Sequence, residues 1–206
     1  MEAVEAIFQP AEMPAHVQEI LTMGLADLFV PVRFIGGSDP HGRLKAVYLT
    51  EGLTALRKIK SLPPGEGLEI LASVIKGMEQ AQRRYLFPEE YILHPALLYL
   101  ERKDQETRAR LIWRSQPGGG HGAESEEVGK SLLTVVYSLK ILTEEEGKTA
   151  LEEAARLILA GKKGMTLIRE LENIRKAQRR VIPAGGGLWG IQAPVSSNVQ
   201  NPAAGR

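Results

Sequence analysis

The clearest hydrophobic pattern in the chain is helical and lies over residues 66–84. There Leu68, Leu71, Ile75 and Met78 recur at intervals of three and four residues, which places them on one face of a helix. We therefore predict a long amphipathic helix in this segment. A shorter helix is expected over residues 15–24.

The second half of the chain repeats this periodicity in three segments. We predict helices over residues 125–142, 143–160 and 166–180. Thr143 and Glu146 have the spacing of a capping box, with Thr143 expected to reach forward and Glu146 back. The inner face of the second helix carries three alanines that permit close packing of a neighbouring helix, namely Ala150, Ala154 and Ala155.

Shorter apolar runs separated by turn residues predict two β-hairpins. Residues 28–37 and 43–50 flank a Gly-, Ser-, Asp- and Pro-rich turn, and residues 96–101 and 108–114 flank a charged turn. Residues 53–60 are interpreted as a short helix. The pattern as a whole predicts an α+β fold with an N-terminal β-hairpin, a central helix–hairpin unit and C-terminal helices.

Breaks in this pattern suggest the domain limits. Residues 1–14 are expected to be a loose lead-in, residues 15–180 a single domain, and residues 181–206 a disordered tail rich in Gly, Pro, Ser and Asn.

Composition removes several classes of function. The chain has 206 residues, of which 43% are hydrophobic, a formal net charge of +1 and no cysteine. It can therefore bury a core, but it cannot form disulfides, thiolate metal sites or a cysteine nucleophile. The N-terminus does not have the pattern of a signal peptide, and the longest apolar run, residues 131–139, is too short for a membrane span. A cytoplasmic protein is expected.

Two Gly-Lys pairs, at 129–130 and 147–148, resemble part of a phosphate-binding loop. Such a loop requires a second glycine five positions before the glycine of the pair, and those positions hold Glu124 and Leu142. Acidic neighbours would also repel phosphate. We interpret both pairs as solvated helix positions.

The remaining chemical groups do not form a recognisable site. The four histidines lack metal-ligand spacing, and the Gly, Ser, Asp and His residues of segment 36–42 suit a turn. We expect no bound metal and no cofactor.

The segment "PEEYILHPALLYLE", residues 88–101, has the layout of a protein-kinase catalytic loop. A long helix precedes it and a hairpin follows it. If Pro95 takes the place of the loop proline, the catalytic base falls at Ile92, the metal-binding Asn at Leu97 and the metal-binding Asp at Trp113. None of these side chains can accept a proton or hold Mg²⁺. If the architecture is kinase-like, the chain is therefore a pseudokinase. The alternative is an unrelated α+β domain that contains a helix–hairpin unit.

Segments 28–57 and 85–114 also carry motifs of a wider family. The hydrophobic–Pro strand, the paired strand before a Leu-rich helix and "LFPEEYILHPALL" resemble a Firmicutes family of unknown function that commonly precedes forkhead-associated domains. More distantly, the layout is similar to the kinase-like cytosolic domain of a type VII secretion component. The resemblance implies a non-catalytic interaction domain in bacterial signalling or in secretion or envelope assembly. It departs from the family because only 26 residues follow Arg180, too few for a forkhead-associated domain.

We therefore expect a scaffold or adaptor with a protein partner and no enzymatic activity. One alternative is a pseudokinase that binds a nucleotide without turnover. Another is weak contact with nucleic acid or an anionic surface through residues 161–180, where seven basic residues face two acidic ones. The candidate anion contacts there are Arg175, Lys176, Arg179 and Arg180. Basic residues near the C-terminal end of a helix also interact favourably with its dipole, and this explains the same charges. Nucleic acid is therefore the less favoured partner.

The tail offers one candidate binding segment, because Leu188, Trp189 and Ile191 form an apolar strip in "GGGLWGI". Three interpretations of this strip stay open: a peptide that docks to a partner, a segment that folds back onto its own domain, and a segment with no role. Self-association through the amphipathic helices is a further option.

Overall fold

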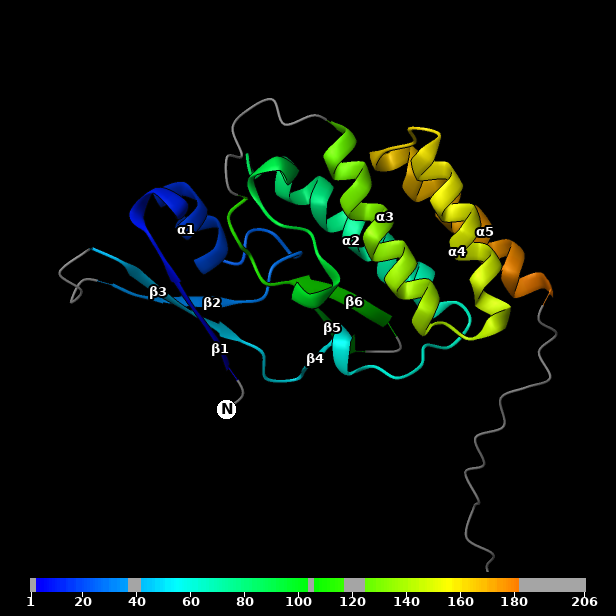
Figure 1. Cartoon of the computed structure of the whole chain (residues 1–206), viewed down its shortest axis with the longest axis horizontal. Coiled ribbons are helices and arrows are strands. Elements are labelled where there is room, and N and C mark those ends of the chain that lie inside the picture. Colours follow the sequence, from blue (N-terminus) through cyan, green and yellow to red (C-terminus); the bar gives the residue numbers. More distant parts are fainter. Residues whose placement is uncertain (1–2, 37–41, 104–105, 117–124, 182–206) are drawn as a thin grey trace, which may run out of the picture.

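A computed structural model describes residues 3–36, 42–103, 106–116 and 125–181. Two three-stranded antiparallel sheets occupy the N-terminal half of the molecule, and a long helix leads to three more helices that form the other end (Figure 1). The predicted α+β class is confirmed.

The first sheet has the strand order β1-β3-β2, formed by β1 (Ala3–Phe8), β3 (Leu44–Leu49) and β2 (Val32–Ile35). The pairing of β2 with β3 confirms the predicted N-terminal hairpin, whose turn at residues 37–41 lies outside the described residues. The helix α1 (Ala15–Thr22) follows β1 and buries Val17, Ile20 and Leu21.

The expectation of a loose lead-in at residues 1–14 was wrong for β1. Its Ala6 pairs with Ala46, and alternate positions Ala6 and Phe8 are buried. Ala3 and Ile7 on the opposite, exposed face are also apolar. The sequence therefore lacks the strict alternation of apolar and polar residues that indicates a strand. The partner strand lies more than 30 residues away in the chain, and it supplies the hydrogen bonds that make this segment a strand.

The second sheet has the order β4-β5-β6, formed by β4 (Leu53–Ala55), β5 (Leu98–Lys103) and β6 (Glu106–Leu111). The hairpin of β5 and β6 was predicted correctly. The helix predicted over residues 53–60 was wrong, because Leu53–Ala55 pairs with Glu101–Tyr99 and only a 3₁₀ turn, Leu56–Lys58, follows it. Tertiary pairing overrides the helical propensity of such a short segment.

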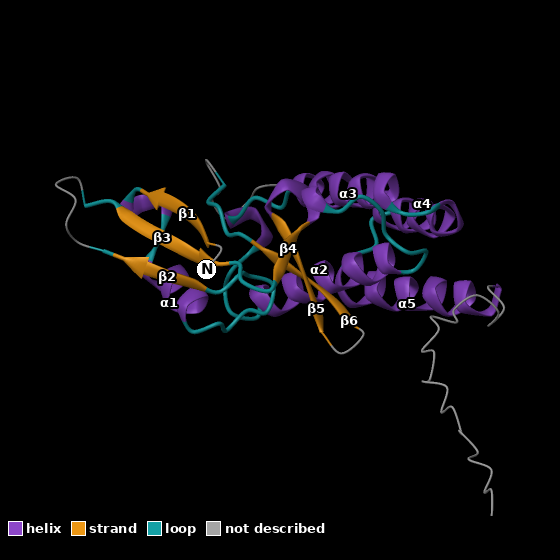
Figure 2. Ribbon diagram, turned by 90° about the horizontal axis from the view of Figure 1, so that it is seen from below, coloured by secondary structure: helices purple, strands orange, loops and turns teal. Residues whose placement is uncertain are grey.

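The predicted central helix is α2 (Glu66–Gln82), and its predicted apolar face is buried. It packs on β6, α5 and α3, and so joins the second sheet to the helical end of the molecule (Figure 2). Its C-terminal turn ends at Tyr85, which adopts a left-handed φ of 61°.

The three C-terminal helices are α3 (Ser125–Leu142), α4 (Glu145–Leu159) and α5 (Gly164–Val181). The predicted alanine face of α4 is buried. The predicted capping box is absent, since Glu144 is the N-cap and makes no side-chain cap hydrogen bond. Thr143 is buried at the end of α3, where its hydroxyl donates to the Leu139 carbonyl at 2.8 Å. The preceding helix thus uses the hydroxyl that was assigned to the next one.

The two sheets are joined at Trp113, whose side chain is 1% exposed. The Tyr48 hydroxyl, from β3, donates to the Trp113 carbonyl oxygen at 2.7 Å, and the rings of Phe8 and Trp113 lie 5.6 Å apart. One cluster of buried side chains therefore runs from β1 to α5. No helix within the described ranges is long and apolar enough to cross a membrane.

Candidate functional site

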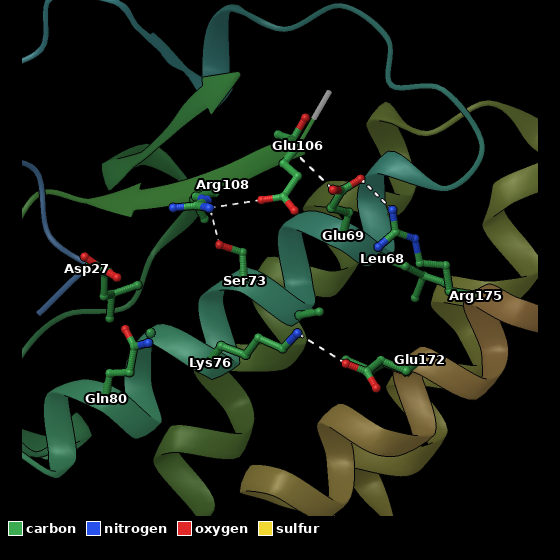
Figure 3. Close-up of a pocket in the computed structure, with 16 residues that line it drawn as sticks. Asp27, Leu68, Glu69, Ser73, Lys76, Gln80, Glu106, Arg108, Glu172 and Arg175 are labelled. Atoms are coloured by element: carbon green, nitrogen blue, oxygen red, sulfur yellow. Dashed lines mark hydrogen bonds and ion pairs between the residues drawn. The ribbon is translucent and has the colours of Figure 1, made fainter. Parts of the chain in front are cut away.

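A polar groove of about 370 Å³ lies between α2, β6 and α5. The exposed face of α2 forms its floor, with Glu69, Ser73, Lys76 and Gln80 following one another at helical spacing (Figure 3). Glu106 and Arg108 of β6 line one side, and Glu172 and Arg175 of α5 line the other.

The free edge of β6 is covered by side chains of α2. The Ala109 N–H donates to Ser73 Oγ at 3.0 Å, and the Thr107 N–H donates to Glu69 Oε1 at 3.4 Å. Glu66 Oε1 accepts from the Thr107 hydroxyl at 2.8 Å. These bonds satisfy an edge that would otherwise offer unpaired amides to another strand.

Two ion pairs tie α5 to α2 along the groove. Arg175 lies 3.1 Å from Glu69, and Lys76 lies 3.2 Å from Glu172. Glu69 therefore binds both β6 and α5. Arg108 pairs with Glu106 at 3.0 Å on the same strand, so the charges of the groove largely neutralise one another.

A third group of charges fixes the segment before β2 against the second sheet. Arg110 donates from Nε and a terminal nitrogen to Glu101 Oε2, at 2.9 and 2.6 Å, and it also donates to the Asp27 carbonyl. The Arg110 side chain is only 17% exposed, so water screens this pair less than the others.

The structure separates the residues predicted to contact anions. Arg175 lies in the groove, paired with Glu69, while Lys176 is exposed on α5. The side chains of Arg179 and Arg180 lie outside the described residues, as do Leu188, Trp189 and Ile191.

The positions compared with a kinase loop are brought together by backbone hydrogen bonds. The Ile92 N–H donates to the Arg114 carbonyl, and the Ile112 N–H donates to the Leu97 carbonyl, both at 2.9 Å. Trp113 is a core residue. Within the described residues, no group of three or more His, Cys, Asp or Glu side chains could hold a metal ion.

Two buried tyrosines, Tyr48 and Tyr91, have a pKa above that of an exposed tyrosine. Burial raises the pKa of Tyr48, and burial followed by the charges of Glu89 and Glu90 raises the pKa of Tyr91. The Tyr48 hydroxyl has a carbonyl partner, but the Tyr91 hydroxyl is buried without a hydrogen-bond partner.

A second and larger depression, of about 710 Å³, lies between α2, α3 and the turn from α4 to α5. We call it the apolar groove, because the larger part of its exposed surface is apolar. The lining includes Ile75 and Met78 of α2, Leu132 and Leu133 of α3, Ile158 and Leu159 of α4, and Leu167 of α5. Six charged residues also line it, namely Glu79, Glu89, Glu126, Lys130, Lys162 and Lys163.

Sequence reasoning missed most of both grooves. The signal for the first was present as the polar stripe Glu69, Ser73, Lys76 and Gln80, on the face of α2 away from its leucines. The facing elements, β6 and α5, could not be inferred, since they lie up to 106 residues away in the chain.

Comparison with known proteins gives little. No family model matches the chain, and no curated protein matches it. Among solved structures, the cytoplasmic fragment of Staphylococcus aureus EssB is similar at 16% sequence identity and a TM-score of 0.46, over 86% of this chain and 99% of that one. A likeness at this level carries no inference about function. The resemblance to the family that precedes forkhead-associated domains, and to pseudokinases, stays a prediction.

Proposed function

We propose that this chain is a non-catalytic interaction domain, a scaffold or adaptor of bacterial signalling or of secretion or envelope assembly. The observation that carries the proposal is the pairing of the charged side chains in the polar groove. Glu69 is engaged by Arg175 and Thr107, and Lys76 by Glu172. Groups held in this way stabilise the packing of α5 and β6 on α2 and are poorly suited to transfer protons to a substrate.

The apolar residues at the kinase-like positions support the same proposal. Trp113 fills the junction of the two sheets, and Ile92 and Leu97 have no atoms that bind Mg²⁺. A domain that has a groove on each side of α2, but no reactive side chain at these positions, suits recognition of a protein.

The first test is capture of the tagged full-length chain with its bound proteins, beside a chain that ends at Arg180. A partner present in stoichiometric amount, and binding again when both proteins are purified, is the expected result. Loss of that partner from the shortened chain would place the contact in residues 181–206. Failure of purified proteins to form a complex would contradict an adaptor role.

The second test addresses catalysis directly. The purified chain is incubated with ATP and Mg²⁺, beside the Lys76→Ala and Lys130→Ala variants. We expect phosphate release at the background rate in all three. Turnover above background in the wild-type chain that is abolished in one variant would overturn the non-catalytic proposal.

A further inference from the structure

The rim of the apolar groove exposes large hydrophobic side chains. Leu159, at the end of α4, is 67% exposed, and Met165, next to the lining residue Gly164, is 50% exposed. Exposed apolar residues beside an apolar depression mark a surface that another segment covers.

The chain itself supplies a segment of matching chemistry. After Val181 it continues for 25 residues, with no charged side chain before Arg206, and it carries Leu188, Trp189 and Ile191 within four positions. We propose that residues 188–191 dock in the apolar groove of the same molecule, with Trp189 as the anchor. A tryptophan on an uncharged strip supplies the large apolar surface that such a groove accepts.

The length of the connection allows this docking. α5 starts at the groove, where Leu167 is a lining residue, and ends at Val181. The 14 steps between these two residues cover about 21 Å at 1.5 Å per residue. Trp189 lies eight residues beyond Val181 and reaches about 26–29 Å when the chain is extended.

The composition of the connection is suited to the return path. Residues 182–187 carry no charged side chain, and Gly185, Gly186 and Gly187 have no side chain that would hinder the extended path along α5. A tether this short also keeps the strip at a high effective concentration near its own groove, which favours docking within one molecule over docking between two.

The chain provides its own fluorescent probe for the test. It has two tryptophans, and Trp113 is 1% exposed and therefore shielded from a quencher in the folded protein. Quenching by iodide or acrylamide thus reports on Trp189. The experiment compares the full-length wild-type chain with Leu159→Glu, which places a charge at the groove, and with Ile141→Glu as the matched control. Ile141 is 81% exposed on α3 and does not line the groove, and neither position is buried, so both variants should fold.

We expect Trp189 in the wild-type chain to be shielded and its emission to lie to the blue of free tryptophan. Leu159→Glu should raise the Stern–Volmer constant several-fold and shift the emission to the red, while Ile141→Glu should leave both unchanged. The Trp189→Phe variant supplies the Trp113 baseline that is subtracted.

Two outcomes would overturn the proposal. One is a wild-type Trp189 as accessible as free tryptophan, with no change in Leu159→Glu. The other is shielding that disappears on dilution, which would assign the contact to a second copy. The measurement uses the purified chain alone, so its failure is distinct from failure of the proposed adaptor role.

Discussion

Two tyrosine hydroxyls buried in the same core make opposite contributions to stability. The Tyr48 hydroxyl donates to the Trp113 carbonyl at 2.7 Å, whereas the Tyr91 hydroxyl has no partner. A buried hydrogen bond contributes roughly 1 kcal/mol net, and a buried polar atom without a partner is a cost. Removing each hydroxyl in turn therefore distinguishes the gain from a buried hydrogen bond from the cost of an unpaired polar atom, and both rings stay in place.

We predict that Tyr48→Phe lowers the free energy of unfolding by about 1–2 kcal/mol, because it leaves the Trp113 carbonyl without its donor. Tyr91→Phe should be neutral or stabilising. Urea denaturation followed by circular dichroism measures both. Equal destabilisation by the two variants would contradict this prediction, because it would show that the Tyr91 hydroxyl is stabilised as well as the Tyr48 hydroxyl is.

At the scale of elements, the packing of α4 depends on a glycine, Gly147, where the helix closely approaches another segment. A Cβ at Gly147, in the first turn of α4, would lie 2.8 Å from the Pro64 Cα and 2.5 Å from Thr143 Cγ2. A backbone atom cannot move aside as a flexible side chain can. Gly129 in α3, by contrast, has nothing within 4 Å of the added carbon.

We expect Gly147→Ala to destabilise the fold by about 1–3 kcal/mol through overpacking. Gly129→Ala, the matched control, should stabilise it by about 0.5–1 kcal/mol, because alanine restricts the unfolded chain more. Thermal unfolding of both variants distinguishes these signs. If Gly147→Ala were also stabilising, the close contact of α4 with Pro64 would be incorrect.

The docking of α5 on α2 is also a property of elements. The Lys76–Glu172 pair has side chains 53% and 46% exposed, so it contributes less than the pair of Arg175 with Glu69, which are 37% and 19% exposed. Lys76→Glu should make the α5 amides exchange their hydrogens faster, because it lowers the free energy of the local opening of α5 by about 0.5–1 kcal/mol.

The double variant Lys76→Glu with Glu172→Lys should restore most of that protection, because it reverses the pair without changing its geometry. Hydrogen exchange of the α5 amides at low ionic strength measures the effect. Unchanged exchange in the single variant would show that the Lys76–Glu172 pair does not contribute to holding α5 in place.

The whole molecule has a predicted alkaline limit of stability. Burial raises the pKa of Tyr48 and of Tyr91 above the ordinary value of 10.0. Above that pH the unfolded chain loses these protons while the folded chain retains them. Fewer protons on the unfolded state mean that stability falls as pH rises.

Stability should therefore be independent of these two groups below about pH 9 and decline above pH 10. Tyr48→Phe and Tyr91→Phe should each flatten that decline, even where they change the stability at neutral pH in different directions. Urea midpoints measured from pH 8 to pH 11 give the slope. An identical slope in wild type and both variants would contradict the assignment to these tyrosines.

The sequence by itself determined those elements of this protein whose pattern is local in the chain. The 3.6-residue pattern of α2, α3 and α4 and the strand–turn–strand signals of both hairpins depend on neighbours in the chain, so local reading found them. Composition likewise removed disulfides and thiolate chemistry.

Tertiary structure alone decided the rest. Residues 3–8 and 53–55 became strands because distant strands supplied their hydrogen bonds, and Thr143 faced back into α3 because it is buried there. Both grooves are made where α2 meets segments remote in sequence, and Glu69 acquires its role only when Arg175 and Thr107 are folded against it. Periodicity reports which face of an element is apolar, but which element covers that face is set by packing of the whole chain.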